Sequence, residues 1–295
     1  MLTPAQIDTY REKGYLVIED VVSASSLARL KALTEEFVDK AAGVPGHTDV
    51  YDVADGHTPE APLVRRIKLP HKAHAEFRAF ASDPVLTDIM ADLLGHDVRL
   101  HGGKINLKPG TAADAVEWHQ DWAFYPHTND DLLAVGVMLD DMDLENGPIL
   151  MLPGTHRGPV YDHHAEGKFS GAIDLDSCDL DFSKAETVTG RAGSISVHHV
   201  RLVHGSSANL SGKPRRLLLW EYAAADAWPL MGAGDLDEFD ERMVRGDPTL
   251  APRLTDVPVR IPLPAALHPG SIFENQRAAA ARFFEPADSR SAAYS

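Results

Sequence analysis

The sequence predicts an α+β fold in which helices come first and a core of short antiparallel strands, a sandwich or barrel, follows. Up to about residue 96, apolar residues recur at helical spacing between capping residues. From residue 97, short strand-like runs are separated by clusters of Gly, Pro, Asn or Asp. Because no segment is suited to be a long linker, we expect one domain over residues 1–295, with a helical part over about 1–96, a strand core over about 97–225 and a C-terminal extension over about 226–295.

The helical part is predicted from its caps and its apolar periodicity. Thr3 precedes a proline, which is typical of an N-cap and a first helical residue, and Gly14 is a usual helix end. Leu27, Leu30 and Leu33 share one helical face. The expected elements are a helix up to Gly14, a strand over 15–18, a helix from Ser25 or Ser26, a loop over 42–63 and a helix over 83–94.

The strand core is predicted from short apolar or alternating runs between turn residues. These runs cover residues 98–100, 104–108, 116–122, 132–140, 148–152, 194–199 and 215–222. The C-terminal extension has a different character. It contains an acidic patch over 235–241, a proline-rich run over 252–264 and an expected helix over 275–284.

Composition and charge exclude several classes of protein. The chain has 28 Lys and Arg against 44 Asp and Glu, a net charge of −16, so we expect neither nucleic acid nor a membrane as partner. Cys178 is the one cysteine, which excludes an internal disulfide and a cysteine-based metal cluster. The longest apolar run, 132–139, is far shorter than the roughly 20 residues of a bilayer span. Since residues 1–14 lack an apolar signal core, we expect a cytoplasmic protein; the sequence leaves its oligomeric state open.

A candidate metal site comes from His119 and Asp121, which are two residues apart in a strand-like run and therefore share a face. His204 follows a later strand and completes a set of two imidazoles and one carboxylate, which on Fe(II) leaves positions open for oxygen chemistry. Arg215 begins the next strand-like run, where it can hold an anion near the metal. The triplet His-x-Asp is weak evidence by itself, because a chain with 15 histidines contains such triplets by chance, and a second one begins at His47 in a polar loop where we expect it to be solvated.

The order of motifs along the chain is more specific. It runs from Glu-Trp-His-Gln-Asp-Trp over 117–122 through Leu-Glu-Asn-Gly-Pro over 144–148 and Pro-Gly-Thr-His over 153–156 to His-Gly-Ser over 204–206 and Arg215. This order resembles the phytanoyl-CoA dioxygenase family, to which ectoine hydroxylases are similar, over about residues 15–222. The resemblance implies a double-stranded β-helix (a cupin-like jelly roll) with flanking N-terminal helices. It also implies an Fe(II)-dependent dioxygenase that uses O2 and 2-oxoglutarate.

The resemblance also implies roles for individual residues. Oxidative decarboxylation of 2-oxoglutarate to succinate and CO2 is expected to accompany hydroxylation of an unactivated C–H bond of a small molecule, and the presence of Asp121 disfavours halogenation. No catalytic residue is expected beyond the metal ligands. The implied roles are iron binding for His119, Asp121 and His204, and cosubstrate binding for Arg215, Ser206, Lys104 and Asn106, with Arg66 loosely aligned to another basic position of the cosubstrate region.

The substrate side is less determined by the sequence. Trp122, Phe124 and Tyr125 follow the metal motif and are expected to frame a small-molecule pocket, although aromatic side chains also build cores. A basic cluster over 65–72 is able to meet an anionic substrate, but we favour the solvated start of a helix. The histidine pairs at 163–164 and 198–199 are expected at the surface or behind the metal ligands. For His156, a place behind the ligands and a structural role in its turn are equally favoured.

Two other classes of protein remain open. A zinc hydrolase is able to use the same three ligands with a metal-bound water as nucleophile, but it has no need of Arg215 or of 2-oxoglutarate. A non-catalytic jelly-roll binding protein would retain ligand affinity without His119 or Asp121. The ordered match out to Arg215 favours the oxygenase over both.

Overall fold

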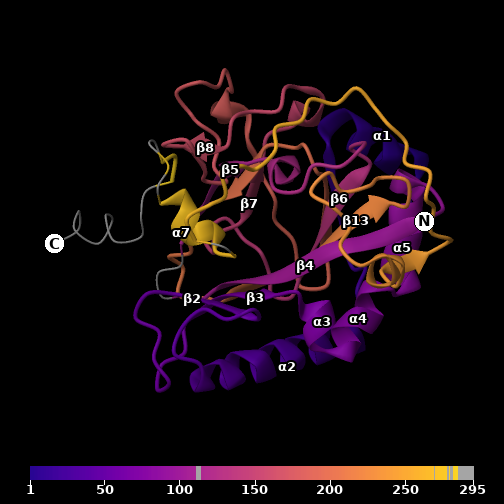
Figure 1. The fold of residues 1–295 in the computed structure, drawn as a ribbon. Coiled ribbons are helices and arrows are strands. Elements are labelled where there is room, and N and C mark those ends of the chain that lie inside the picture. The colour runs from indigo at the N-terminus through magenta and orange to yellow at the C-terminus, as the bar shows by residue number, and fades with distance from the viewer. Residues whose placement is uncertain (111–113, 269, 278, 280–281, 285–295) are drawn as a thin grey trace.

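The computed structural model describes residues 1–110, 114–268, 270–277, 279 and 282–284. The fold is α+β, as expected: an eight-stranded and a four-stranded antiparallel sheet, with most helices before the first long strand. Helices α2, α3 and α4 lie along one side of the large sheet, and strands β5 and β7 of the small sheet lie on its other side (Figure 1).

The predicted elements occur in the expected order, with several short helices and strands between them that were not expected. The N-terminal part contains α1 (Pro4–Lys13), β1 (Tyr15–Ile18), α2 (Ala24–Lys40), β2 (Tyr51–Val53), β3 (Val64–Lys68), α3 (Pro70–Ala73), α4 (Ala75–Ala81) and α5 (Pro84–Leu94). The strand core contains β4 (Val98–Lys108), β5 (Val116–His119), the 3-10 turn η2 (Asp121–Ala123), β6 (Leu132–Met138), β7 (Ile149–Met151), β10 (Glu186–Thr187), β11 (Ile195–His199), β12 (His204–Ser206) and β13 (Arg215–Ala224). Residues beyond β13 form α6 (Leu236–Asp240), β14 (Met243–Arg245) and α7 (Ile272–Gln276). A separate two-stranded hairpin, β8 (His164–Ala165) with β9 (Lys168–Phe169), lies between β7 and β10 in the sequence.

The caps explain where the N-terminal helices begin and end. The Thr3 side chain accepts a hydrogen bond from the backbone of Gln6 in a capping box, and Gly14 closes α1 at a φ of 83°. Helix α2 begins slightly before the predicted Ser25 or Ser26, because the Ser23 hydroxyl accepts from the Ser26 backbone and caps it.

The large sheet has the strand order β1-β11-β6-β13-β4-β3-β2, with β14 also pairing with β4. The prediction of a loop over 42–63 is therefore wrong for the short strand β2. The prediction of a solvated helix start for the basic cluster is wrong as well, because β3 pairs with the long strand β4 and buries Arg65 and Arg66. Arg65 is satisfied there by the Asp114 carboxylate and the Val53 carbonyl, which the sequence pattern does not reveal.

Alternation along β13 divides the interior into two layers. Leu218, Trp220 and Tyr222 point into the core under the helices. Leu217 and Leu219 point the opposite way and pack with residues of the small sheet, including Ile149 and Met151. The inner face of the large sheet therefore lies against the small sheet, and the cavity described below lies between the two.

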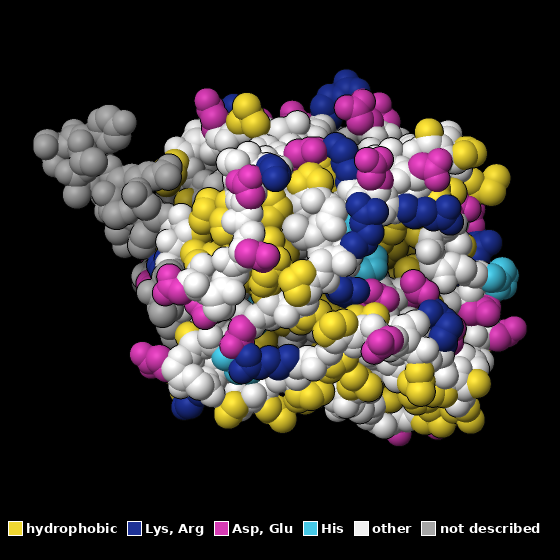
Figure 2. Space-filling model, turned by 90° about the horizontal axis from the view of Figure 1, so that it is seen from above, with side chains coloured by type: hydrophobic (Ala, Val, Ile, Leu, Met, Phe, Trp, Pro, Cys, Tyr) yellow, Lys and Arg dark blue, Asp and Glu magenta, His cyan; other side chains and the backbone are white. Residues whose placement is uncertain are grey.

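The C-terminal extension lies across the strand core. The expected helix over 275–284 is shorter and earlier, since α7 spans Ile272–Gln276, and residues 278, 280 and 281 of the expected range lie outside the described residues. Among the helices in the described part of the chain, none combines the length and apolarity needed to cross a membrane. On the face drawn in Figure 2, acidic and basic side chains are interspersed, and some of them border a hollow in which histidine is visible.

The packing of Gly103 against Trp220 gives a test of the fold. These residues are directly paired on β4 and β13, and a Cβ at Gly103 would overlap the indole ring and lie 2.9 Å from the Leu219 carbonyl oxygen. We expect Gly103→Ala to lower the free energy of unfolding by about 1–3 kcal/mol in chemical denaturation, as overpacking does. Gly43→Ala is the matched control, because a Cβ at Gly43 meets nothing within 4 Å. Equal effects of the two substitutions would contradict this packing.

Candidate metal centre and active site

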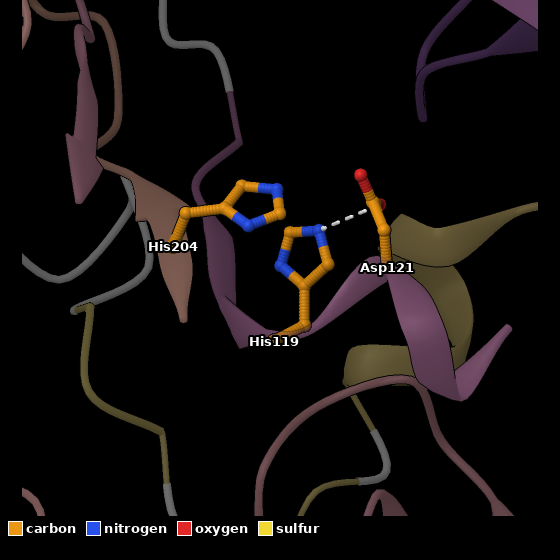
Figure 3. Close-up of side chains that lie close together, drawn as sticks. All are labelled: His119, Asp121 and His204. Carbon is orange, nitrogen blue, oxygen red and sulfur yellow. Dashed lines mark ion pairs between the residues drawn. The ribbon is translucent and has the colours of Figure 1, made fainter. Parts of the chain in front are cut away.

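Two histidines face each other because of the register of the small sheet. Strands β5 and β12 pair antiparallel with His119 opposite His204, and the ring centroids are 4.1 Å apart. Asp121 lies just after β5, at the start of the turn η2, rather than in a continuous strand as the sequence analysis expected. The turn nevertheless points its carboxylate toward the His119 ring (Figure 3).

Backbone carbonyls fix the orientation of both imidazoles. The His119 Nδ1 lies 2.8 Å from the Glu117 carbonyl oxygen, and the His204 Nδ1 lies 2.9 Å from the Leu202 carbonyl oxygen. A carbonyl only accepts, so each Nδ1 carries the proton and donates it. Each Nε2 is thereby left as a lone-pair donor, which is the tautomer that a metal ion requires.

The carboxylate of Asp121 is shared between two neighbours. Its Oδ1 lies 3.8 Å from the His119 Nε2, and its Oδ2 lies 3.3 Å from the Nε2 of His198 on β11. One ligand atom from each of His119, Asp121 and His204 lies within 4.8 Å of the others, and all three residues are buried. This is a donor set for one metal ion, with His198 behind the carboxylate.

Burial and charge set the protonation states of these groups. Burial lowers the pKa of His119 to about 4 and that of His204 well below its usual value. Burial acts to raise the pKa of Asp121, but the Lys104 ammonium and the nearby His198 and His204 hold it well below its usual value. Near neutral pH the site therefore offers two neutral imidazoles and one carboxylate, the forms that bind metal.

A cavity of about 40 Å³ adjoins these donors, between the two sheets. Lys104 and Asn106, which the sequence analysis placed in the cosubstrate pocket, line it from alternate positions of β4. The Lys104 ammonium pairs with the Glu221 carboxylate at 2.8 Å, and the Asn106 Oδ1 accepts a hydrogen bond of 2.9 Å from the Arg66 Nε. Arg66 also lines the cavity, so its loose alignment in the sequence corresponds to a place in the site.

Arg215 and Ser206 lie together on the wall of this cavity. The Arg215 side chain is buried, donates to the Gly147 carbonyl at 2.9 Å and has no carboxylate in ion-pair distance among the described residues. Burial lowers its pKa to about 10, which leaves the guanidinium charged at neutral pH. Lys108, its cross-strand neighbour, donates to the Ser206 Oγ at 2.7 Å and leaves the serine proton free to be donated elsewhere.

The three aromatic residues predicted around the substrate have different places. Trp122 is fully buried in a cluster with Leu132 and Val200 and donates its indole proton to the Pro258 carbonyl. It is not one of the described residues that line the cavity. The expectation that Trp122 frames the pocket is therefore wrong, because η2 ends the strand alternation and turns this ring into the core. Phe124 and Tyr125 are also not among the described residues that line the cavity, and their contact with a substrate stays a prediction. Phe124 contacts the His119 ring edge-on at 5.8 Å between centroids, and the Tyr125 ring lies near enough to Asp121 that burial and this charge raise its pKa well above its usual value.

The remaining histidines are placed by their hydrogen bonds. His163 is buried, and its Nε2 accepts from the backbone of Gln120, between the two metal-motif residues. His156 is bonded to the Arg11 carbonyl against α1, and His47 pairs with the Asp52 and Glu274 carboxylates.

Sequence reasoning did not assign roles to three residues at the site, which are Lys108, Glu221 and Ile272. Alternation along the strands that carry Lys104 and Arg215 is a signal that could have indicated Lys108 and Glu221, whereas the place of Ile272 in the cavity wall depends on a contact between distant segments. His198 was expected at the surface or behind the metal ligands, and the structure places it behind Asp121.

Comparison with known proteins adds a family. The family model described as phytanoyl-CoA dioxygenase (PhyH) matches residues 10–217. A protein named probable alpha-ketoglutarate-dependent hypophosphite dioxygenase, from Stutzerimonas stutzeri, is 39% identical over 279 residues, which cover 93% of this chain and 97% of that protein. Ectoine dioxygenase from Bordetella bronchiseptica is 27% identical over 238 residues, 75% of each chain.

Solved structures share the fold. The structure of EctD from S. alaskensis with 2-oxoglutarate and 5-hydroxyectoine has a TM-score of 0.66 at 24% identity, covering 86% of this chain and 87% of that one. The epimerase SnoN in complex with Fe3+ and alpha-ketoglutarate has a TM-score of 0.64 at 22% identity, covering 85% and 95%. Together with the family match over residues 10–217 and the motif order, these likenesses identify the chain: it belongs to the phytanoyl-CoA dioxygenase family.

Proposed function

We propose that this protein is an Fe(II)- and 2-oxoglutarate-dependent dioxygenase that oxidises a small anion, with hypophosphite as the first candidate. The observation that carries the proposal is the buried set of His119, Asp121 and His204 donors. It lies beside a cavity that also contains Arg215, whose guanidinium has no carboxylate partner within the described part of the chain. A zinc hydrolase would have no use for that guanidinium. The two facing sheets fit a double-stranded β-helix, which we include in the proposal.

The donor set fits iron. Two neutral Nε2 atoms and one carboxylate oxygen, all on one side of the cavity, are the ligands of non-haem Fe(II) oxygenases and leave further positions for 2-oxoglutarate and O2. When bound, iron and 2-oxoglutarate supply an oxidant strong enough to hydroxylate an unactivated bond, with succinate and CO2 as co-products. The protein holds the imidazole tautomers through Glu117 and Leu202 and the carboxylate through His198.

The far carboxylate of 2-oxoglutarate is matched to Arg215. A guanidinium binds a carboxylate through two parallel hydrogen bonds, and a buried guanidinium without an anionic partner is costly, so a bound carboxylate at this place stabilises the protein. Ser206 adds a hydroxyl donor, because Lys108 already occupies its oxygen as acceptor. The three donor side chains are themselves buried, which limits their contact with water.

The substrate candidate comes from the Stutzerimonas stutzeri relative, whose name specifies hypophosphite. The motif order implies attack on a C–H bond, and the name of this relative extends the proposal to a P–H bond. Insertion of one oxygen atom into a P–H bond of hypophosphite gives hydrogen phosphite, while the second atom of O2 enters succinate as 2-oxoglutarate loses CO2.

Removal of the carboxylate tests the metal site. We expect Asp121→Ala to bind Fe(II) at least about 100-fold more weakly than the wild type, because one of three protein ligands is lost. Metal content after anaerobic loading and gel filtration measures this, and an unchanged thermal midpoint shows that the fold persists. Asp49→Ala is the matched control, since Asp49 belongs to the other His-x-Asp triplet and is exposed. Stoichiometric iron in Asp121→Ala would exclude Asp121 as a ligand.

Turnover tests the substrate. With Fe(II), 2-oxoglutarate and O2, we expect hypophosphite to be converted to phosphite, seen by phosphorus NMR, with one succinate formed per phosphite. Asp121→Ala provides the background rate. Succinate release that hypophosphite does not increase would exclude this substrate, and a lack of succinate release with any small anion would exclude the oxidation of small anions.

A further inference from the structure

The cavity contains one more cation than iron and 2-oxoglutarate use. Two basic side chains that line it, Arg66 and Arg215, have no carboxylate in ion-pair distance among the described residues. Arg215 lies at the Ser206 end, where it is matched to one carboxylate of 2-oxoglutarate. The other carboxylate of 2-oxoglutarate belongs at the metal. Arg66 is left over, and a buried cation without an anion is costly unless a ligand supplies one.

Arg66 is held in a fixed position. Its Nε donates to the Asn106 Oδ1 at 2.9 Å, and its guanidinium carbon lies 5.4 Å from the centre of the Phe273 ring of α7. Its two terminal nitrogens have no hydrogen-bond partner within the described part of the chain, although the side chain is about nine-tenths buried. A guanidinium fork held this way is preorganised for two oxygens of one anion.

Helix α7 closes the cavity beside Arg66. Ile272 lines the cavity and packs against Val116 and Phe273. The helix is fastened to the strand that carries His119, because the Gln276 Oε1 accepts from the Glu117 backbone at 2.9 Å and its Nε2 donates to the Gly171 carbonyl. In Figure 1, α7 lies at the edge of the sheets between β5 and β2. It lies beyond residue 217, where the family match ends, so this wall is not part of what the family match describes.

We propose that Arg66, held by Asn106 and Phe273, anchors the negative charge of the substrate, and that Ile272 of α7 limits that substrate to a very small oxyanion. This subsite rests on the proposed oxygenase function and adds the residues that select the substrate. A phosphinate or carboxylate group of two oxygens matches the fork. A larger substituent on phosphorus would meet the Ile272 side chain.

Binding of hypophosphite tests the anchor. The probe is calorimetric titration, without oxygen, of protein loaded with Fe(II) and 2-oxoglutarate. We expect Arg66→Gln to weaken hypophosphite binding by about tenfold or more while the affinity for 2-oxoglutarate changes less than about twofold, since loss of a charged hydrogen-bonding partner has this size. Arg66→Lys, which keeps the charge but not the fork, should restore part of the affinity.

The neighbouring arginine supplies the control. Arg65 also lies 5.4 Å from the Phe273 ring but pairs with Asp114 and is not among the described residues that line the cavity. Arg65→Gln should therefore leave hypophosphite binding unchanged in the folded protein. If Arg66→Gln weakens 2-oxoglutarate binding instead and spares hypophosphite, Arg66 belongs to the cosubstrate and the proposal is overturned.

The size limit has its own test. We expect the wild type to bind methylphosphinate, which replaces one hydrogen of hypophosphite by a methyl group, at least about tenfold more weakly than hypophosphite, and Ile272→Ala to remove most of this difference by creating space. An unchanged ratio of the two affinities in Ile272→Ala would overturn the role of α7.

Binding is measured apart from turnover, so the subsite and the proposed function can fail separately. A wild type that binds hypophosphite through Arg66 without oxidising it would contradict the proposed function and support the subsite. If the wild type oxidises hypophosphite and Arg66→Gln binds hypophosphite as tightly as the wild type does, the proposed function is supported and the subsite is contradicted.

Discussion

The candidate site depends on the pairing of β5 with β12, which sets His119 directly opposite His204. This register brings together two residues that are 85 positions apart in the sequence, and the carbonyls of Glu117 and Leu202 then turn each Nε2 inward. Because side chains alternate along strands, a slip of one residue would point one imidazole away from the other and abolish the site. Asp121 relies on the same strand, since η2 begins just after β5 ends.

A second constraint is electrostatic. The chain as a whole has a net charge of −16, yet Arg66, Lys104 and Arg215 line one small buried cavity. Burying cations is unfavourable unless anions neutralise them. Of the nearby carboxylates, Asp121 belongs to the metal site and Glu221 pairs with Lys104, so neither Arg66 nor Arg215 has an ion-pair partner among the described residues. The arrangement fits a protein that binds anionic ligands there, with 2-oxoglutarate at Arg215 and a smaller anion at Arg66. In both the selection of substrate and the binding of cosubstrate, an anionic ligand thus neutralises a buried guanidinium.

The three predicted metal donors do lie together in the structure, and they could be found from the sequence because short motifs have a spacing with a direct geometric meaning. It predicted the helices from caps such as Thr3 and Gly14, and the strand core from turn residues. It failed for β3, because a run of basic residues resembles a solvated segment until the partner strand β4 is known. It also placed Trp122 at the pocket, where the turn η2 instead directs that ring into the core. The positions of His198 and of α7 depend on long-range contacts that periodicity does not encode.

The most direct test of the account is the anaerobic addition of Fe(II) and 2-oxoglutarate to metal-free protein, followed by the visible charge-transfer band of the iron chelate. The account predicts a band in the wild type, a midpoint in 2-oxoglutarate about 10- to 100-fold higher in Arg215→Ala, and a wild-type midpoint in Arg216→Ala, whose side chain pairs with Asp140 and Glu35 instead. The absence of a band with iron and 2-oxoglutarate both saturating, or equal midpoints in the two arginine variants, would contradict it.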